Sequence, residues 1–301
     1  MDKPEDIRHI AFIGGGNVAS QLIPWMQSRG FVVTGLVHRT SERAAELALR
    51  HQIPTYGTTL DSLPPTIDAL FLSVPDAVLA PLARELAAHR PDWKGVLIAH
   101  FSGALPARIL QPLQRQGGSI LSMHPLQTIR ASLPTRLEGI PVILEGPPES
   151  IAIGKYLAYQ LSWHPFELSE EEKPAYHVMA VMASNFLVTL FSLARDIAPS
   201  SLTPSLGEML YPIMEQTLRN LRTHPPEEVL TGPVTRGDVP TIAHHLETLQ
   251  QRAPHLLPTY LALLAETLDL ALRGHRLSSD AATQMLERIE QTLHTITPPT
   301  D

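Results

Sequence analysis

The stretch FIGGGNVAS, residues 12–20, decides the fold that we expect for the first half of the chain. It ends an apolar run, IRHIAFIG (7–14), that is typical of a buried strand, and it leads into a helix-like segment. Gly14, Gly16 and Ala19 have the GxGxxA spacing, which in this strand-to-helix context predicts a dinucleotide-binding turn. The first glycine would make the tight turn, the second would admit the pyrophosphate, and the alanine would let the helix pack closely against the sheet. The amides at the helix start, which would face the phosphates, belong to Asn17, Val18 and Ala19. The alternative is a glycine-rich turn without a ligand.

The end of the second predicted strand, FVVTGLVHR (31–39), indicates which dinucleotide binds. The polar residues at this point are His38, Arg39, Thr40 and Ser41. NAD enzymes tend to end this strand with an acidic residue for the ribose 2′-hydroxyl, and here no acid ends the strand. A guanidinium beside two hydroxyls suits a 2′-phosphate instead, so we expect NADP (NADPH) as the cofactor. The alternative is that Arg39 is an ordinary solvated surface residue.

Strand-like and helix-like segments alternate through the first half of the chain. Further strand-like runs lie at 68–75, 95–103, 119–125, 140–146 and 163–169. This alternation predicts an α/β fold of the Rossmann type, a doubly wound parallel sheet with helices on both faces. Beyond about residue 170 the segments read only as helices, at 174–197, 205–222, 239–251, 255–273 and 279–295. We therefore expect a Rossmann-like dinucleotide-binding domain at 1–170 and an all-α helical domain, for substrate binding or dimerisation, at 171–301.

Composition argues against several classes of protein. The net charge of −7 over 301 residues disfavours a nucleic-acid-binding protein, because such proteins usually carry a basic patch. The chain has no cysteine, which excludes disulfides, thiolate catalysis and cysteine zinc sites. The N-terminal MDKPEDIRH lacks the order of a signal peptide, and no apolar run is expected to reach the ~18–20 residues of a membrane helix. We expect a cytoplasmic protein that binds no membrane.

Residues that suit catalysis follow the carboxyl ends of the predicted strands, where doubly wound sheets bind their ligands. Val74 and Pro75 end the third strand and are expected near the nicotinamide. Ser102 and Gly103 end the next strand, in the motif HFSG, and His124 ends the one after, in MHPLQT. The structural alternatives are backbone hydrogen bonding for the histidine and capping of the following turn for the serine.

A second group of polar residues interrupts the apolar segment YHVMAVMASN at the start of the helical half. At about 100° per residue, Ser184 lies nearly in line with His177, and Asn185 lies about a quarter-turn away. Hydride transfer to a carbonyl or an imine needs a proton donor, and histidine titrates in the useful range, so we expect His177 to be catalytic. A buried structural link is the alternative for Asn185.

The chain has 14 histidines, including the adjacent pair His244 and His245. Adjacent histidines on a helix point about 100° apart and do not chelate one ion together. No HxxxH pair or histidine-carboxylate spacing stands out, so we expect no metal site.

The glycine-rich turn, HFSG, MHPLQT, YHVMAVMASN and LTGPVTRGDVPTIAHHL (230–246) together resemble a family of oxidoreductases that join a Rossmann-like domain to a helical domain of unknown function. The resemblance covers nearly the whole chain. Wider relatives of that family include pyrroline-5-carboxylate reductase, ketopantoate reductase and the F420-dependent NADP oxidoreductases. Ketopantoate reductases carry a catalytic lysine on the corresponding helix, with asparagines four and eight residues later. If His177 takes the lysine's place, Asn185 falls on the second asparagine but Val181 occupies the first, so the resemblance does not carry the lysine mechanism over.

The last of these motifs suggests a substrate-binding loop at 230–238, the counterpart of a helix-end loop in pyrroline-5-carboxylate reductases. Asp238 would cap the helix that starts near Val239. Arg236 and the free amides at the helix start would then bind an anion such as a substrate carboxylate. The alternative is that Arg236 pairs with Asp238 or a nearby acid and only locks the loop.

Together these features predict an NADP-dependent oxidoreductase that reduces a small carboxylate bearing a carbonyl or an imine, in the cleft between two domains. Ketopantoate is the leading substrate by resemblance, and an imino acid is the next. The expected catalytic residues are His177, Asn185, Ser102 and His124, and the expected substrate-binding residues are Gly103, Ser184, Arg236 and Asp238. The alternatives are an NADP-binding sensor and a structural dimer, both without turnover. The apolar faces of the helical half predict a homodimer.

Overall fold

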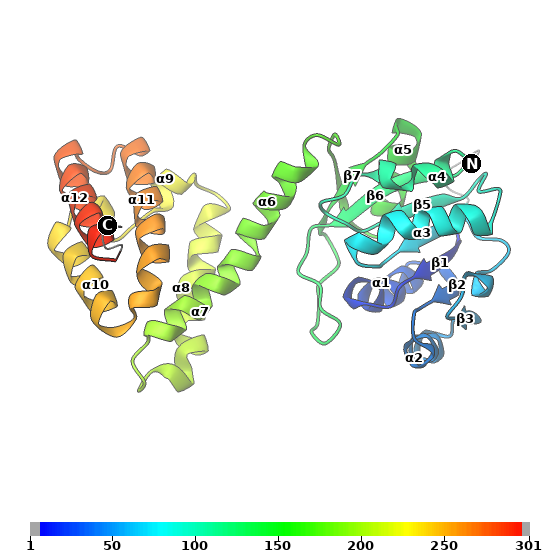
Figure 1. Ribbon diagram of the computed structural model, residues 1–301, viewed down its shortest axis with the longest axis horizontal. Helices are drawn as coiled ribbons and strands as arrows, with labels where there is room; N and C mark the ends of the chain where they lie inside the picture. Colours follow the sequence, from blue (N-terminus) through cyan, green and yellow to red (C-terminus); the bar gives the residue numbers. More distant parts are fainter. Residues whose placement is uncertain (1–6, 297–301) are drawn as a thin grey trace, which may run out of the picture. The chain divides into compact units, whose positions relative to one another are not determined.

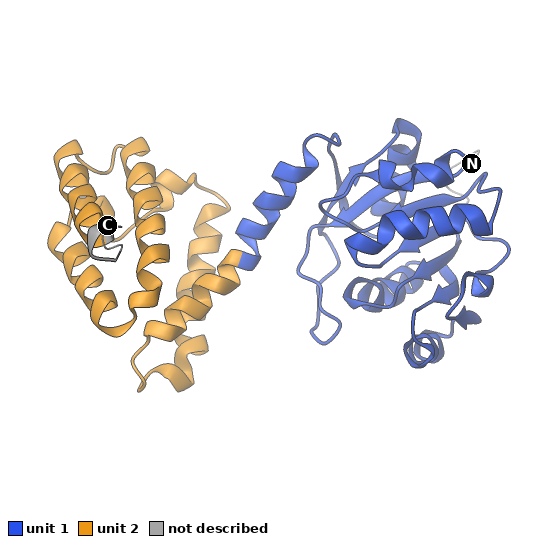
Figure 2. Cartoon of the chain, in the orientation of Figure 1, with its two compact units in different colours: residues 1–185 blue, residues 186–301 orange. Residues whose placement is uncertain are grey.

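The computed structural model describes residues 7–296 and divides into two compact units, residues 1–185 and 186–301 (Figure 2). The first unit includes helix α6 (Lys173–Ala183), which the sequence analysis placed in the helical domain. The division falls beyond this helix because its side chains bond to the sheet. Lys173 donates to Ser122, and Tyr176 contacts His124.

An eight-stranded sheet, in the order β3-β2-β1-β4-β5-β6-β7-β8, forms the centre of the first unit (Figure 1). The strands are β1 (His9–Ile13), β2 (Val32–Val37), β3 (Thr55–Gly57), β4 (Ala69–Leu72), β5 (Leu97–His100), β6 (Ser119–Pro125), β7 (Pro141–Glu145) and β8 (His164–Glu167). The chain order reverses between β1 and β4, the place where doubly wound sheets bind ligands. Sequence analysis missed β3 because its three residues, TYG, form no apolar run.

One strand pair departs from the predicted parallel sheet. β6 and β7 are antiparallel, with His124 opposite Ile143, whereas β7 and β8 are parallel again. The connection between β6 and β7 contains no helix, so the chain returns along the sheet without the crossover that parallel neighbours require. The sheet is therefore mostly parallel, with β7 and β8 running against the other six strands.

Helices cover both faces of the sheet, as the alternating pattern predicts. One apolar core joins the sheet to α1 (Asn17–Ser28), α2 (Ser41–His51) and α5 (Pro148–Gln160), and the other joins it to α3 (Asp76–His89) and α4 (Gln111–Gln114). Neighbouring strand residues alternate between the two cores. Phe12 packs in the first and Ile13 in the second, because successive side chains of a strand point to opposite faces.

The second unit is helical. Its helices are α7 (Asn185–Ile197), α8 (Leu206–Leu221), α9 (Pro226–Val229), α10 (Val239–Arg252), α11 (Leu257–Arg273) and α12 (Ser279–Ile296). Its core lies between α10, α11 and α12, where Leu246, Leu264 and Met285 are buried. The segment expected as one helix at 174–197 is instead two, α6 and α7, with a break of one residue at Ser184, where φ is −116° and ψ is −68°.

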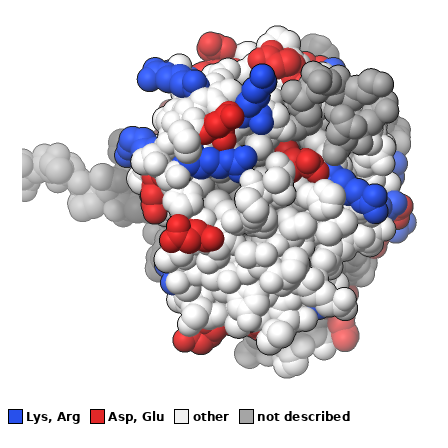
Figure 3. All heavy atoms as spheres, turned by 90° about the vertical axis from the view of Figure 1, so that its right-hand side faces the viewer, with Lys and Arg blue, Asp and Glu red and all other residues white. Residues whose placement is uncertain are grey.

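Helices α7 and α8 expose much of their apolar surface. Helix α7 has no buried residue. The large exposed side chains are Phe186, Val188, Leu190, Met209, Tyr211, Ile213, Leu218 and Leu221. By contrast, on the face of the first unit shown in Figure 3, basic and acidic side chains are interspersed beside a broad uncharged area.

The expectation that no apolar run reaches the length of a membrane helix was wrong. The segment Lys173–Ile197, 25 residues with a mean hydropathy of 1.7, is long and apolar enough to cross a membrane by those criteria alone. Its polar residues, such as His177, Ser184 and Asn185, had divided it into shorter runs in the sequence.

Candidate functional site

The glycine-rich turn between β1 and α1 has the backbone that a dinucleotide site requires. Gly14 has φ +100°, and a Cβ atom built on it would lie 2.0 Å from the carbonyl oxygen of Ser73. The turn is therefore pressed against the end of β4, where only glycine fits. A Cβ on Gly16 would meet nothing within 4 Å, so the backbone there borders open space. Ala19 is fully buried, and its amide donates to the Ser73 hydroxyl at 3.2 Å.

A cavity of about 520 Å³ lies beside this turn, and its lining matches the expected cofactor site. The predicted residues that line it are Gly14, Gly16, His38, Arg39, Val74 and Pro75. Thr58 and Thr59 also line it, from the segment after β3, and were not predicted because β3 itself forms no apolar run in the sequence. Asn17, Val18, Ala19, Thr40 and Ser41 are not among the lining residues. The Asn17 side chain instead accepts from the Ala131 amide at 3.0 Å.

Arg39 is the lining residue best suited to a phosphate. It is exposed, and it forms no hydrogen bond or ion pair within the described part of the chain. Neighbouring His38 is engaged locally, because its Nδ1 lies 3.1 Å from the Thr40 hydroxyl. The Gly16 backbone, which borders open space, and the Arg39 guanidinium, which has no protein partner within the described part of the chain, line the same cavity. These residues therefore fit a dinucleotide that carries an additional phosphate.

A second arginine, Arg43, holds the glycine-rich turn in place. Its Nε donates to the carbonyl oxygen of Gly15 at 3.2 Å, and Nη2 donates to the Ser20 hydroxyl at 2.8 Å. Its Nη1 forms an ion pair with Glu46 at 2.7 Å. The two arginines of the VHRTSER segment therefore differ in role, since Arg43 is engaged by the protein and Arg39 is not.

Asp76 links the strand end that lines the cofactor cavity to Ser102, because it follows Pro75 in the chain. The Ser102 hydroxyl donates to the Asp76 carboxylate at 2.8 Å. The same hydroxyl accepts from the amides of Ala104 and Leu105, at 3.2 and 3.0 Å. Ser102 is buried and has all these partners, which corresponds to the turn-capping alternative and leaves its hydroxyl little capacity for a substrate.

His124 and His177 converge on Gly103. A Cβ atom at Gly103 would lie 3.1 Å from His124 Nε2 and 3.0 Å from His177 Nδ1. Nδ1 of His177 is buried and has no hydrogen-bond partner within the described residues. Two imidazole nitrogens from different elements, β6 and α6, thus face the point above one glycine. A buried polar atom without a partner is uncommon in folded proteins and is consistent with a ligand that completes it.

The two histidines also line a cavity of about 330 Å³. Ser184 and Asn185 line the same cavity, as do Leu126, Gln127 and Thr128 from the segment after β6. The Ser184 hydroxyl lies 3.1 Å from the Thr128 hydroxyl. The structure therefore brings His124 of β6 to the same small cavity as His177, Ser184 and Asn185, which lie much later in the sequence.

A buried lysine beside these residues was missed. Lys173, at the first position of α6, is fully buried, and its Nζ donates to Ser122 at 2.7 Å and to the Ser102 carbonyl at 3.4 Å. Burial lowers the pKa of Lys173. The resemblance to ketopantoate reductases placed a catalytic lysine at the position of His177, whereas Lys173 lies one helical turn earlier.

His124 and His100 are held neutral. Burial, and then the neighbouring Lys173 and His177, lower the pKa of His124 to about 4. Burial is also the main reason that the pKa of His100 falls to about 4. At neutral pH, His124 is therefore an uncharged imidazole with one donor and one acceptor nitrogen.

In the second unit, the 230–238 loop has the predicted helix cap. The Asp238 carboxylate accepts from the Thr241 amide at 3.1 Å and from its hydroxyl at 2.7 Å. Gly237 has φ +66°, a conformation that favours glycine. Arg236 is exposed, and no ion pair joins it to Asp238 or to another described acid, although its charge helps to lower the pKa of Asp238 after the two Thr241 hydrogen bonds.

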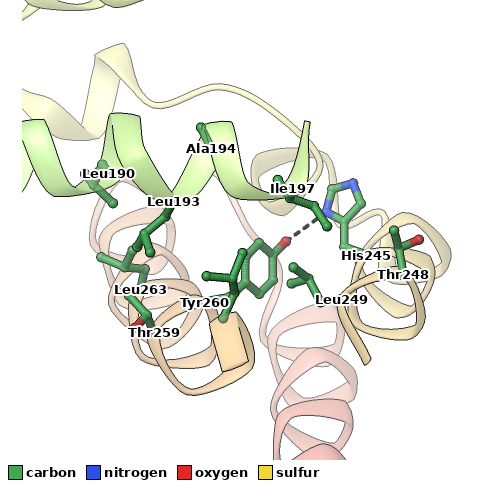
Figure 4. Close-up of a pocket in the computed structure, with 11 residues that line it drawn as sticks. Leu190, Leu193, Ala194, Ile197, His245, Thr248, Leu249, Thr259, Tyr260 and Leu263 are labelled. Carbon is green, nitrogen blue, oxygen red and sulfur yellow. Dashed lines mark hydrogen bonds between the residues drawn. The ribbon is translucent and has the colours of Figure 1, made fainter. Parts of the chain in front are cut away.

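The adjacent histidines of α10 point in different directions. His244 is exposed, whereas Nδ1 of His245 lies 2.8 Å from the Tyr260 hydroxyl. Both His245 and Tyr260 border a cavity of about 340 Å³ that is otherwise lined mainly by apolar side chains of α7, α10 and α11 (Figure 4). Among the side chains that the structure describes, which end at residue 292, no group of three metal-ligating residues occurs.

Each half of the chain matches the model of a known domain. Residues 3–125 match the model of a Rossmann-like domain, and residues 140–267 match a domain of unknown function, DUF2520. These two matches confirm the resemblance that the motifs indicated. No curated protein matches the chain.

Several solved structures are similar over most of the chain. A candidate NADP oxidoreductase from Bacteroides fragilis is 25% identical, with a TM-score of 0.72, and the match covers 89% of this chain and 100% of that one. A protein from Thermotoga maritima is also 25% identical, with a TM-score of 0.63 and coverage of 86% and 98%. An imine reductase from Myxococcus stipitatus, solved with NADP⁺, is 17% identical, with a TM-score of 0.64 and coverage of 92% and 99%; at this identity it is similar in fold alone.

Proposed function

We propose that this protein, which joins a Rossmann-like domain to a DUF2520 domain, is an NADP-dependent reductase of a small carboxylate that bears a carbonyl or an imine. The observation that carries the proposal is the convergence of His124 and His177 on Gly103, whose neighbour Ser102 bonds to Asp76, the residue after Pro75 of the cofactor cavity. The similarity to a candidate NADP oxidoreductase supports the cofactor. Among carbonyl substrates ketopantoate is our first candidate, and cyclic imino acids are the second.

Bound NADPH would supply the hydride. His177, when protonated, would give its Nδ1 proton to the carbonyl oxygen or imine nitrogen as that atom gains negative charge, leaving a neutral imidazole. His124 would hold the same atom from the other side. Ser184 and Asn185, which line the cavity with both histidines, would contact the remainder of the substrate.

Arg236 is the proposed ligand of the substrate carboxylate. Its guanidinium is exposed and without an ion pair among the described acids, and the loop that carries it is fixed by the Asp238 cap. With an active substrate, Arg236→Gln should raise KM about tenfold or more, since a charge-assisted hydrogen bond is lost. Arg252→Gln, at an exposed arginine near the end of α10, is the matched control. An unchanged KM in Arg236→Gln would assign the carboxylate to another residue.

The choice of NADPH over NADH is expected to depend on Arg39. Because its guanidinium lines the cofactor cavity without a protein partner, Arg39→Gln should weaken NADPH binding by about 10- to 100-fold and leave NADH binding nearly unchanged. Isothermal titration with each dinucleotide measures both effects. Arg50→Gln, at an exposed arginine of the same α2 region that pairs with Glu46, should change neither affinity. Equal losses for both dinucleotides would show that Arg39 does not bind a 2′-phosphate.

We also propose that the protein is a homodimer through its helical unit. The exposed apolar side chains of α7 and α8 flank a groove of about 400 Å³ lined by Leu187, Val188, Phe191, Tyr211, Met214, Glu215 and Leu218. Exposed apolar surface of this kind is usually covered by a partner, and a second copy of the chain covers it without another protein. Light scattering should give twice the chain mass of 33.1 kDa at micromolar concentration, and a monomer there would contradict the proposal.

A further inference from the structure

Tyr176 and His124 form a close hydrogen-bonded pair between α6 and β6. The Tyr176 hydroxyl lies 2.5 Å from His124 Nδ1, and the two rings meet edge to face at 77°. Tyr176 is 7% exposed, so water does not compete for this contact. The bond joins the residue before His177 to the other histidine of the site, which makes Tyr176 part of its supporting structure.

The direction of this hydrogen bond follows from the protonation states of its partners. Burial raises the pKa of Tyr176 to about 12, so the phenol keeps its proton at neutral pH. His124, with its pKa lowered to about 4, is a neutral imidazole under the same conditions. A phenol is the better donor and a bare imidazole nitrogen the better acceptor, so the Tyr176 hydroxyl donates to Nδ1. The ring proton of His124 is then on Nε2.

Of the two ring nitrogens of His124, Nε2 is the one beside Gly103, at 3.1 Å from the position that an added Cβ would take. His177 Nδ1 also lies beside Gly103, at 3.0 Å from that position. In this tautomer, His124 presents an N–H donor beside Gly103, and its ring lines the same cavity as His177. In the opposite tautomer it would present a lone pair, which repels a carbonyl oxygen or an imine nitrogen.

We propose that Tyr176 is a positioning residue that fixes His124 in the Nε2–H tautomer, so that His124 donates a hydrogen bond to the reacting oxygen or nitrogen above Gly103. This role rests on the proposed reductase function, in which His177 gives the proton. His124 then holds the reacting atom by a hydrogen bond as an uncharged donor, and His177 transfers the proton to it.

The charged and titratable neighbours of His124 support the same division. Lys173 and His177 on α6 both disfavour a positive charge on His124, and His100 on β5 is its neighbour from the sheet. Lys173 donates a hydrogen bond to Ser122, which lies two residues before His124 on β6. With no described carboxylate hydrogen-bonded to it, the imidazole remains neutral, and the phenol alone determines which nitrogen carries the proton.

Nitrogen-15 NMR of the imidazole side chains tests this directly, with the His124 signals assigned by their loss in His124→Gln. In the wild-type protein at pH 7 we expect His124 with a protonated Nε2 and a bare, hydrogen-bonded Nδ1. In Tyr176→Phe we expect the Nδ1 resonance to shift and the two tautomers to mix. A protonated Nδ1 in the wild-type protein, or identical His124 spectra in the two proteins, would overturn the proposal.

The chain offers a matched control, because His245 and Tyr260 form a similar pair in the second unit, with 2.8 Å between Nδ1 and the hydroxyl. Tyr260→Phe should alter the His245 signals and leave those of His124 unchanged. The wild-type tautomer is measured without a substrate, so it decides the role of Tyr176 even if no reductase activity is found. With an active substrate, Tyr176→Phe should lower kcat about tenfold with little change in the Kd for NADPH.

Discussion

Replacing His177 with alanine is expected to lower turnover by a factor of about 10² to 10⁴, the usual contribution of a positioned proton donor. The Nδ1 atom of His177 is buried, lacks a protein partner and faces the same point above Gly103 as His124. Steady-state kinetics with the active substrate would measure the loss, and titration with NADPH would show that the cofactor still binds.

The matched control for His177→Ala is His244→Ala, at an exposed histidine of α10. It should retain full turnover. A loss of less than about threefold in His177→Ala would exclude this residue as the proton donor and would leave His124 as the candidate.

The second large effect is expected for Gly103→Ala. The added methyl group would lie about 3.0 Å from an atom of each imidazole, closer than such contacts normally allow. It would therefore push both imidazoles away from their positions beside Gly103. We expect kcat to fall by about 10²-fold, as displacements near 1 Å can do in an active site, while NADPH binding is retained.

A glycine in open space provides the control for this substitution. Gly207, on α8, has nothing within 4 Å of an added Cβ atom, so Gly207→Ala should leave kinetics and folding unchanged. Circular dichroism would confirm that Gly103→Ala still folds. Wild-type turnover in folded Gly103→Ala would show that the reaction does not take place between the two histidines.

The N-terminal fold could be predicted from sequence because its signals are local. An apolar run ending in Gly14, followed by the GxGxxA spacing, specifies a strand, a tight turn and a helix within a few residues. The reversal of β7 could not be read in this way. The reversal depends on the connection between β6 and β7, which forms no helix. The sequence of a strand does not by itself show whether it pairs in the parallel or the antiparallel direction.

Only those parts of the candidate site that have a local signal in the sequence could be predicted. His124 and His177 were identified as polar residues at a strand end and within an apolar helix. Their convergence on Gly103 depends on how α6 packs against β6, which sequence spacing does not show. Lys173 was missed because a charged residue at a helix start is usually solvated, and only tertiary packing buries this one completely.

The measurement that tests the central claim most directly is the oxidation of NADPH by the pure protein, followed at the nicotinamide absorbance band. The panel should contain 2-keto acids, with ketopantoate among them, and cyclic imino acids. We predict sustained turnover with at least one compound, faster with NADPH than with NADH and lost in His177→Ala. Tight binding of NADPH with no oxidation by any member of the panel would contradict the proposed reductase and would favour a protein that senses the cofactor without turning it over.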